Sequence, residues 1–279
     1  MIGKLAEFVG VPMIVVAIVA TLLYFDFGGS LTQESHAADG KGQQALLDTL
    51  APDIPSLPLI KIEFPNLYKD LQSQIEKEIQ SGADERVLAK RLHDLLYRAL
   101  QVYRPLLKYA DDDKIITALK AKRALTLKLK KSKGELVCAQ VFSGSTGAFL
   151  DSYTVVESES TQEGLALFQL LADAQVKAKD DGLVIHYTAE PAQKKVRVIG
   201  KPADKPTDAD LYLPANPAFD ALMKVYPMDS LSRIFAADPT DKQLCDSEVR
   251  LYDALVGLPA PHGPAMRKYI VDLLYFAGY

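Results

Sequence analysis

The hydrophobic residues of this chain follow two patterns. Residues 8–25 form one uncharged apolar run, whereas from Pro65 onward apolar residues mostly recur every three or four positions. The second spacing is that of an amphipathic helix. The first such stripe is Leu67, Leu71, Ile75 and Ile79. The pattern predicts a mainly α-helical protein, with a predominantly helical globular domain over residues 65–279.

The N-terminal run predicts a single transmembrane helix, with residues 1–27 as the membrane anchor. At ~1.5 Å per residue, residues 8–25 would form a helix of roughly 27 Å, close to the ~30 Å of a hydrocarbon core. Two alternatives stay open. Lys4 before the run and Ser35-His36-Ala37 after it fit a cleaved signal peptide. The run would also fit a helix buried in a protein core.

The charges around the run favour one orientation of the anchor. Lys4 lies before it, and Lys41 is the nearest cation after it. Basic residues favour the cytoplasmic side of a membrane. The sequence therefore predicts a single-pass signal-anchor protein with a cytoplasmic N-terminus and an extracytoplasmic C-terminal domain, periplasmic if the organism is a bacterium.

Residues 28–64 read as a tether followed by a proline-rich stalk. The stretch after the anchor is small and polar, and Pro52, Pro55 and Pro58 then follow at intervals of three. Prolines at this spacing favour extended backbone, and they could alternatively dock in an aromatic groove. A second proline-rich stretch over residues 200–217 predicts an internal domain boundary.

Several further helices are expected in the globular domain. Ser160-Thr161-Gln162-Glu163 has the form of a capping box, which predicts that a helix begins there and runs to about Lys179. Apolar periodicity and flanking Gly or Pro place the others at residues 84–107, 217–225, 228–236, 238–256 and 265–277.

One or two small β-hairpins are also predicted. Residues 183–188 and 195–199 are rich in β-branched residues and are separated by a loop, as in a hairpin. Residues 124–142 fit either of two structures. They could continue a helix through Cys138, or Leu125 to Lys130 could pair with Glu135 to Cys138, which would place Lys130 opposite Glu135.

The charge distribution offers one binding hypothesis. The chain has a net charge of −4, yet residues 114–133 contain eight basic residues and no acidic one. A patch for anionic lipid or another polyanion would comprise Lys120, Lys122, Arg123, Lys128, Lys130, Lys131 and Lys133. The alternative is a solvated surface. No nucleic-acid partner is expected, because residues 111–141 contain no aromatic residue on which bases could stack.

No metal or cofactor site is predicted. Asp111-Asp112-Asp113 resembles a helix cap more than a cation loop, whose ligands are spread over about twelve residues. Cys138 and Cys245 are 107 residues apart and belong to no CxxC motif, which argues against zinc. They could form a disulfide in an oxidising compartment or remain two buried thiols.

The sequence contains no complete catalytic motif. Ser143 and Ser145 lie in a flexible Ser/Gly turn, and Ser143 replaces the first glycine of a nucleophile elbow. We therefore expect a non-catalytic binding or scaffolding module, a subunit or accessory of an envelope complex with a protein partner. The alternative is an anchored hydrolase of envelope material, with Ser143 or Ser145 as nucleophile and His186 or His262 as base.

Overall fold

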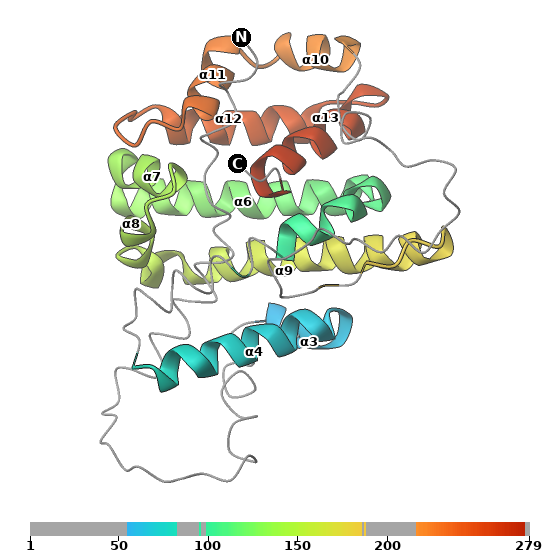
Figure 1. The fold of residues 1–279 in the computed structure, drawn as a ribbon. Helices are drawn as coiled ribbons and strands as arrows, with labels where there is room; N and C mark the ends of the chain where they lie inside the picture. Colours follow the sequence, from blue (N-terminus) through green and yellow to red (C-terminus); the bar gives the residue numbers. More distant parts are fainter. Residues whose placement is uncertain (1–54, 83–94, 96–98, 186, 188–215, 277–279) are drawn as a thin grey trace.

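The structure, a computed structural model, describes residues 55–82, 95, 99–185, 187 and 216–276 (Figure 1). Every regular element within these residues is helical, so the prediction of a mainly α protein is confirmed. The elements are α3 (Ser56–Glu63), α4 (Pro65–Gln80), η2 (Arg104–Tyr109), α6 (Asp112–Lys133), α7 (Glu135–Phe142), α8 (Thr146–Leu150), α9 (Tyr153–Asp180), α10 (Asn216–Met223), α11 (Met228–Ala236), α12 (Leu244–Gly257), α13 (His262–Val271) and η3 (Asp272–Phe276).

The helices are stacked in layers around α6 and α9, which run side by side through the middle of the molecule (Figure 1). The pair α3–α4 lies below α9 in this view, and α12 and α13 lie above α6. The layer furthest from α4 contains α10 and α11. Since α6 is covered by α9, α12 and α13, it is the central element of the core.

Charge and glycine placement define the ends of α6. Asp112 and Asp113 lie in its first turn and three lysines in its last, which complements the helix dipole. Gly134 then takes a φ of 85°, a conformation that side chains disfavour, and α7 begins at the next residue. The hairpin alternative for residues 124–142 is therefore wrong. Leu125 and Leu129 are four apart and both buried, which is helical spacing.

The prediction of an extended stalk is wrong for its last part. Residues Ser56–Glu63 form α3, which packs against α9. Leu57 and Ile60 of this helix are completely buried. Burial of that apolar face outweighs the preference of closely spaced prolines for extended backbone.

Several predicted helix starts differ from the observed ones. The helix expected from Ser160 is α9, which begins at Tyr153, so the supposed capping box lies inside it. The helix expected from residue 238 is α12, which begins at Leu244, because the Asp238 side chain instead accepts a hydrogen bond from the Thr240 amide in a preceding turn. The helix over residues 65–80 is observed as α4, and of the helix over 84–107 the structure describes helical residues 95 and 99–103, followed by η2.

Other sequence predictions fall wholly or partly outside the described residues. These include the anchor at 8–25, the tether to residue 54, most of the boundary at 200–217, and the second hairpin strand at 195–199. Residues 183–185 are not in a strand. Within the part of the chain that the structure describes, no helix is both long and apolar enough to cross a bilayer.

We expect Gly263→Ala to lower the free energy of unfolding by about 1–3 kcal/mol, the usual cost of overpacking. A Cβ at this position would lie 2.0 Å from the Leu258 carbonyl oxygen and 2.8 Å from the Arg267 guanidinium. Urea denaturation followed by circular dichroism measures the change. Gly257→Ala is the matched control, because a Cβ there meets nothing within 4 Å. Equal stability of the two variants would contradict the prediction.

Candidate functional site

The seven residues of the predicted basic patch all lie on α6, and four of them make ion pairs within the protein. Lys122 is buried against Glu163. The other ion pairs join Arg123 to Asp253, Lys128 to Glu159, and Lys130 to both Glu135 and Asp246. Lys120, Lys131 and Lys133 are exposed and make no ion pair with the described part of the chain. The anionic-ligand patch stays a prediction.

Lys122 belongs to a cluster of charged and phenolic side chains in the core, which we call the buried ionic cluster. Its Nζ lies 3.1 Å from Oε1 of Glu163 on α9, and the Tyr275 hydroxyl donates a 2.7 Å hydrogen bond to the same oxygen. On α12, the Tyr252 hydroxyl donates to Oε2 of Glu248 at 3.2 Å. The ion pair and the Tyr275 hydrogen bond join α6, α9 and η3, whereas the Tyr252–Glu248 hydrogen bond lies within α12.

Burial determines the protonation states in this cluster. It raises the pKa of Glu248 to about 8, although the Lys122 charge acts in the opposite direction. Burial likewise raises the pKa values of Tyr252 and Tyr275, so both phenols remain hydrogen-bond donors at neutral pH. With Glu248 protonated, one ammonium faces one carboxylate, Glu163, and the cluster is electrically neutral.

The buried ionic cluster is closed to solvent. None of its five residues is more than 5% exposed. Ser160 Oγ, Ser247 Oγ and Glu163 Oε2 also lie within the core and have no hydrogen-bond partner in the described structure. Since an external molecule cannot reach these groups, the cluster orients helices and does not form a site for substrate.

We expect Glu248→Gln to remove part of the pH dependence of stability. The folded pKa lies above the ordinary value of 4.5, so the folded state holds an extra proton between about pH 4.5 and pH 8. Stability from this group is therefore full below pH 4.5 and falls as pH rises to about 8, by up to about 1.4 kcal/mol per pH unit. The difference in free energy of unfolding, variant minus wild type, should increase from pH 5 to pH 8. A constant difference would contradict the protonated state of Glu248.

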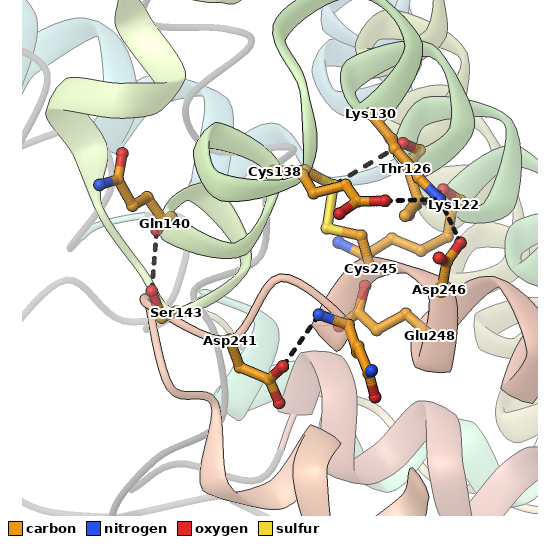
Figure 2. The surroundings of a disulfide bond; sticks show 12 residues. Lys122, Thr126, Lys130, Cys138, Gln140, Ser143, Asp241, Cys245, Asp246 and Glu248 are labelled. Carbon is orange, nitrogen blue, oxygen red and sulfur yellow. Dashed lines mark hydrogen bonds and ion pairs between the residues drawn. A yellow bond between two sulfur atoms is a disulfide. The ribbon is translucent and has the colours of Figure 1, made fainter.

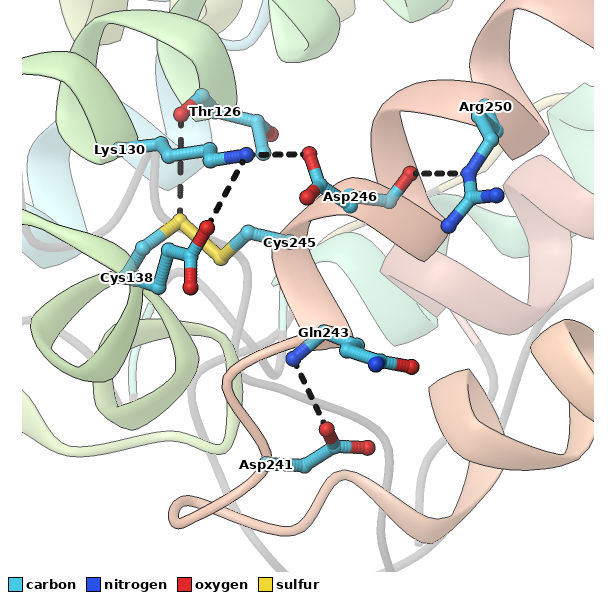
Figure 3. A network of polar contacts seen from close by, with 9 residues as sticks. Thr126, Lys130, Cys138, Asp241, Gln243, Cys245, Asp246 and Arg250 are labelled. Atoms are coloured by element: carbon cyan, nitrogen blue, oxygen red, sulfur yellow. Dashed lines mark hydrogen bonds and ion pairs between the residues drawn. A yellow bond between two sulfur atoms is a disulfide. The ribbon is translucent and has the colours of Figure 1, made fainter.

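Cys138 of α7 and Cys245 of α12 form a disulfide next to this cluster, and both residues are completely buried (Figure 2). Polar contacts lie beside the bond (Figure 3). Lys130 bridges Glu135 and Asp246 there, and the Gln243 amide donates to Asp241 Oδ1 at 2.9 Å. The bond and these contacts together fasten the α6–α7 turn to the start of α12.

The two serines proposed as nucleophiles both hydrogen-bond to backbone groups of the turn that contains them. Ser143 Oγ donates to the Gln140 carbonyl at 3.0 Å, and Ser145 Oγ accepts from the Ala148 amide at 3.3 Å as the cap of α8. His262 begins α13, and His186 lies outside the described residues. Among the described side chains, neither serine hydrogen-bonds to a histidine.

Two residues of the acidic triplet at the start of α6, Asp111 and Asp112, also make contacts within the protein. Asp111 pairs with Lys177, and Asp112 accepts two hydrogen bonds from the buried Arg267 guanidinium at 2.7 and 2.5 Å. Asp111 occupies the cap position of α6, but its side chain makes no capping hydrogen bond. The described residues contain no group of three His, Cys, Asp or Glu side chains that could hold a metal ion.

A pocket of about 280 Å³ opens between the α3–α4 junction, Tyr103, the end of α9 and residues Val184, Ile185 and Tyr187. Its aromatic lining residues are Phe64, Tyr103 and Tyr187, and we call it the aromatic pocket. The Phe64 ring meets Tyr103 edge-on with centroids 4.8 Å apart, while Tyr187 stacks on Tyr103 at 6.3 Å. The Tyr187 hydroxyl donates a 2.8 Å hydrogen bond to Asp70 Oδ2, which holds the Tyr187 ring in place.

One polar group in the aromatic pocket has no partner among the residues that the structure describes. Tyr103 is 97% buried by its neighbours, with only 3% of its surface exposed, and its hydroxyl makes no hydrogen bond to any described residue. Burial raises the pKa of this phenol, so it keeps its proton. Because Tyr103 lines the pocket, a molecule bound there could accept a hydrogen bond from this hydroxyl.

Apolar and charged side chains surround the opening of the aromatic pocket. Ile62 on its edge is 73% exposed, the highest value among the large hydrophobic residues that the structure describes. Lys179 and Glu63 also line the opening, and neither makes an ion pair with the described part of the chain. The three rings of the pocket are only 2–6% exposed, so most of its exposed surface is polar, and Ile62 is the exposed apolar side chain in its lining.

Sequence reasoning missed the aromatic pocket. Its three aromatic residues are separated by 39 and 84 positions, and no local pattern connects them. The Pro-x-x-Pro spacing was a signal for an aromatic groove, but Pro55 and Pro58 belong instead to the start of α3.

Comparison with known proteins leaves the chain without an assigned family. No protein-family model, no curated protein and no solved structure matches it. Its function is therefore inferred from its own residues.

Proposed function

We propose that this protein is a non-catalytic binding or scaffolding module, anchored in a membrane through residues 8–25, with its helical domain on the extracytoplasmic side. It would serve as a subunit or accessory of an envelope complex and contact a protein partner there. The observation that carries the proposal is the aromatic pocket with the exposed Ile62 on its edge. A partner would cover this side chain and could pair with Lys179 and Glu63, which line the same pocket and make no ion pair with the described part of the chain.

Two further features support a binding role. The apolar run at 8–25 is long enough to tether the chain, and it is followed by about thirty residues before α3. The disulfide and the buried ionic cluster join α7, α12, α6 and α9 into a rigid support for a surface. A disulfide also fits an oxidising compartment outside the cytoplasm.

The alternative of an anchored hydrolase draws no support from the described site geometry. Ser143 and Ser145 are engaged with the backbone of their own turn. An anionic lipid or polyanion partner would rely on Lys120, Lys131 and Lys133, since the other basic residues of α6 are paired. We therefore place a protein first among partners.

Crosslinking and affinity capture of the full-length protein from its native membranes test the proposal. Stoichiometric recovery of one or a few envelope proteins, identified by mass spectrometry, is the expected result. Recovery of the protein alone and monomeric, with crosslinking verified on a known complex in the same membranes, would contradict it.

A further inference from the structure

We infer that one exposed side of α6, which we call the α6 stripe, lies against the anionic surface of the bilayer in which the chain is anchored. The stripe comprises Lys120, Ala124, Leu127 and Lys131, and all four residues are exposed. In this contact the two lysines bind lipid phosphates, and Leu127 enters the headgroup layer between them. The inference rests on the membrane anchor of the proposed function and adds a second contact, between the helical domain and the lipid.

Helical geometry places the four side chains of the α6 stripe in one line. They follow one another at intervals of four, three and four residues, which is the spacing of a single helix face. Lys120 and Lys131 are thereby separated by about 16 Å along the axis, at ~1.5 Å per residue. Leu127 lies between them and is 37% exposed. A lipid surface suits this order, because lysine side chains can reach headgroups beside a shallowly inserted apolar residue.

Ion pairs neutralise the acidic side chains that flank the α6 stripe. On one side of it Asp253 of α12 pairs with Arg123 at 2.6 Å, and on the other Glu159 of α9 pairs with Lys128 at 4.0 Å. The two lysines of the stripe make no ion pair with the described part of the chain. Asp113 is exposed on the same side of α6, but it lies two turns before the first of these lysines. The stripe itself therefore presents uncompensated positive charge.

The end of α6 continues the combination of basic and apolar residues. Lys133 is the last residue of α6 and is exposed, and Leu136 in the first turn of α7 is 42% exposed. Lys130 pairs here with both Glu135 and Asp246. Together with Lys133 and the last lysine of the stripe, this end holds three cations and two carboxylates, so its net charge is also positive.

The connection to the anchor brings the α6 stripe within reach of the bilayer. Residues 28–54 separate the predicted anchor from the first described element, α3. A flexible chain of this length would span roughly 25–30 Å on average. Such a connection holds the domain near the lipid at an effective concentration in the mM range. A surface that binds too weakly to recruit a free protein would therefore be occupied in an anchored one.

The absence of tryptophan from the chain allows a direct test. Full-length Leu127→Trp is reconstituted into vesicles of phosphatidylcholine alone, or of equal parts phosphatidylcholine and phosphatidylglycerol, with the phosphatidylcholine brominated on its acyl chains to quench nearby tryptophan. We expect strong quenching in the mixed vesicles, much less in phosphatidylcholine alone, and its loss at about 1 M salt, where the Debye length is roughly 3 Å. Val225→Trp is the matched control, because Val225 is 59% exposed and adjoins α10, which α12 and α13 separate from α6 (Figure 1). Phosphatidylglycerol should not change its emission.

Charge reversals test the part played by the lysines. In the Leu127→Trp background, the pair Lys120→Glu and Lys131→Glu should lower the ratio of docked to undocked domains by at least roughly 20-fold, since each lysine near an anionic surface contributes about fivefold. Lys69→Glu with Lys77→Glu is the matched control. Both of these lysines are exposed on α4, on the far side of α9 from α6, and their reversal changes the net charge equally (Figure 1). This control should retain the quenching.

Flotation of the vesicles distinguishes failure of the inference from failure of the proposed function. Flotation at about 1 M salt reports the anchor alone, because the contact of the lysines with lipid is then screened. A chain that floats but shows no lipid-dependent quenching would overturn the inference and leave the anchor intact. Equal quenching of Leu127→Trp and Val225→Trp, or equal loss from the two charge reversals, would overturn it as well. A chain that does not float would contradict the anchor and the inference together.

Discussion

Replacing both Cys138 and Cys245 with alanine is expected to lower the free energy of unfolding by about 4 kcal/mol. The disulfide closes a loop with a sequence separation of 107 residues, and in the chain-entropy model a loop near 100 residues is stabilised by about 4.7 kcal/mol. Both residues are buried, so the variant also loses packing between α7 and α12. Urea denaturation under oxidising conditions measures the change.

A reducing agent provides the control for the disulfide prediction. Dithiothreitol in the denaturation series should bring the wild type close to the double variant and leave the double variant unchanged. A double variant within about 1 kcal/mol of the oxidised wild type would show that the loop closure contributes little.

Lys122→Met is expected to lower the free energy of unfolding by about 3–5 kcal/mol, the usual cost of breaking a buried ion pair from one side. The methionine keeps most of the side-chain volume, but it leaves Glu163 as an uncompensated charge in a core where it is completely buried. The Tyr275 hydroxyl would remain its hydrogen-bond donor. Thermal or urea unfolding of the full-length protein at pH 7 measures the loss.

A double-mutant cycle separates the charge effect from general packing damage. Glu163→Gln removes the charge that Lys122→Met leaves unpaired, so the double variant should be less destabilised than the sum of the two single variants, with a coupling of about 1–3 kcal/mol. Simple additivity would mean that the two groups do not interact across the 3.1 Å that separates them.

Apolar periodicity predicts where the helices of this protein lie, but it often does not predict the residue at which a helix begins. The stripe of residues four apart identified α4 correctly, and α10 and α11 lie close to their predicted ranges. The Ser160–Glu163 motif misled because its two polar ends point into the core: Ser160 is buried, and Glu163 pairs with Lys122. A capping motif and a polar pair on one buried helix face have the same spacing.

The central helix shows why local patterns can support two structures. Alternation over Leu125, Leu127 and Leu129 suggested a strand, yet only Leu125 and Leu129 are buried and Leu127 is 37% exposed. The expected pairing of Lys130 with Glu135 does occur, at 3.4 Å, but across the Gly134 turn between two helices. The glycine at φ 85° permits this turn, and burial against α9 and α12 determines the choice of helix.

The sequence pattern could have predicted that Lys122 is buried, but it could not have predicted which residues Lys122 contacts. Ala118, Lys122, Leu125 and Leu129 share one helical face, so a lysine on that face was a signal for a buried charge. Glu163 and Glu248 come from helices 41 and 126 residues away, and only tertiary packing brings them to it. The same reason hides the aromatic pocket, whose walls come from three separate segments.

Site-specific photocrosslinking in native membranes tests the central claim most directly. A benzophenone amino acid is placed at position 62, beside the aromatic pocket, and in a separate sample at position 225, on the opposite side of the helix stack. We predict that position 62 gives one dominant protein adduct and that position 225 gives none above background. Equal labelling from both positions, or no protein adduct from position 62, would contradict a binding module that uses this pocket.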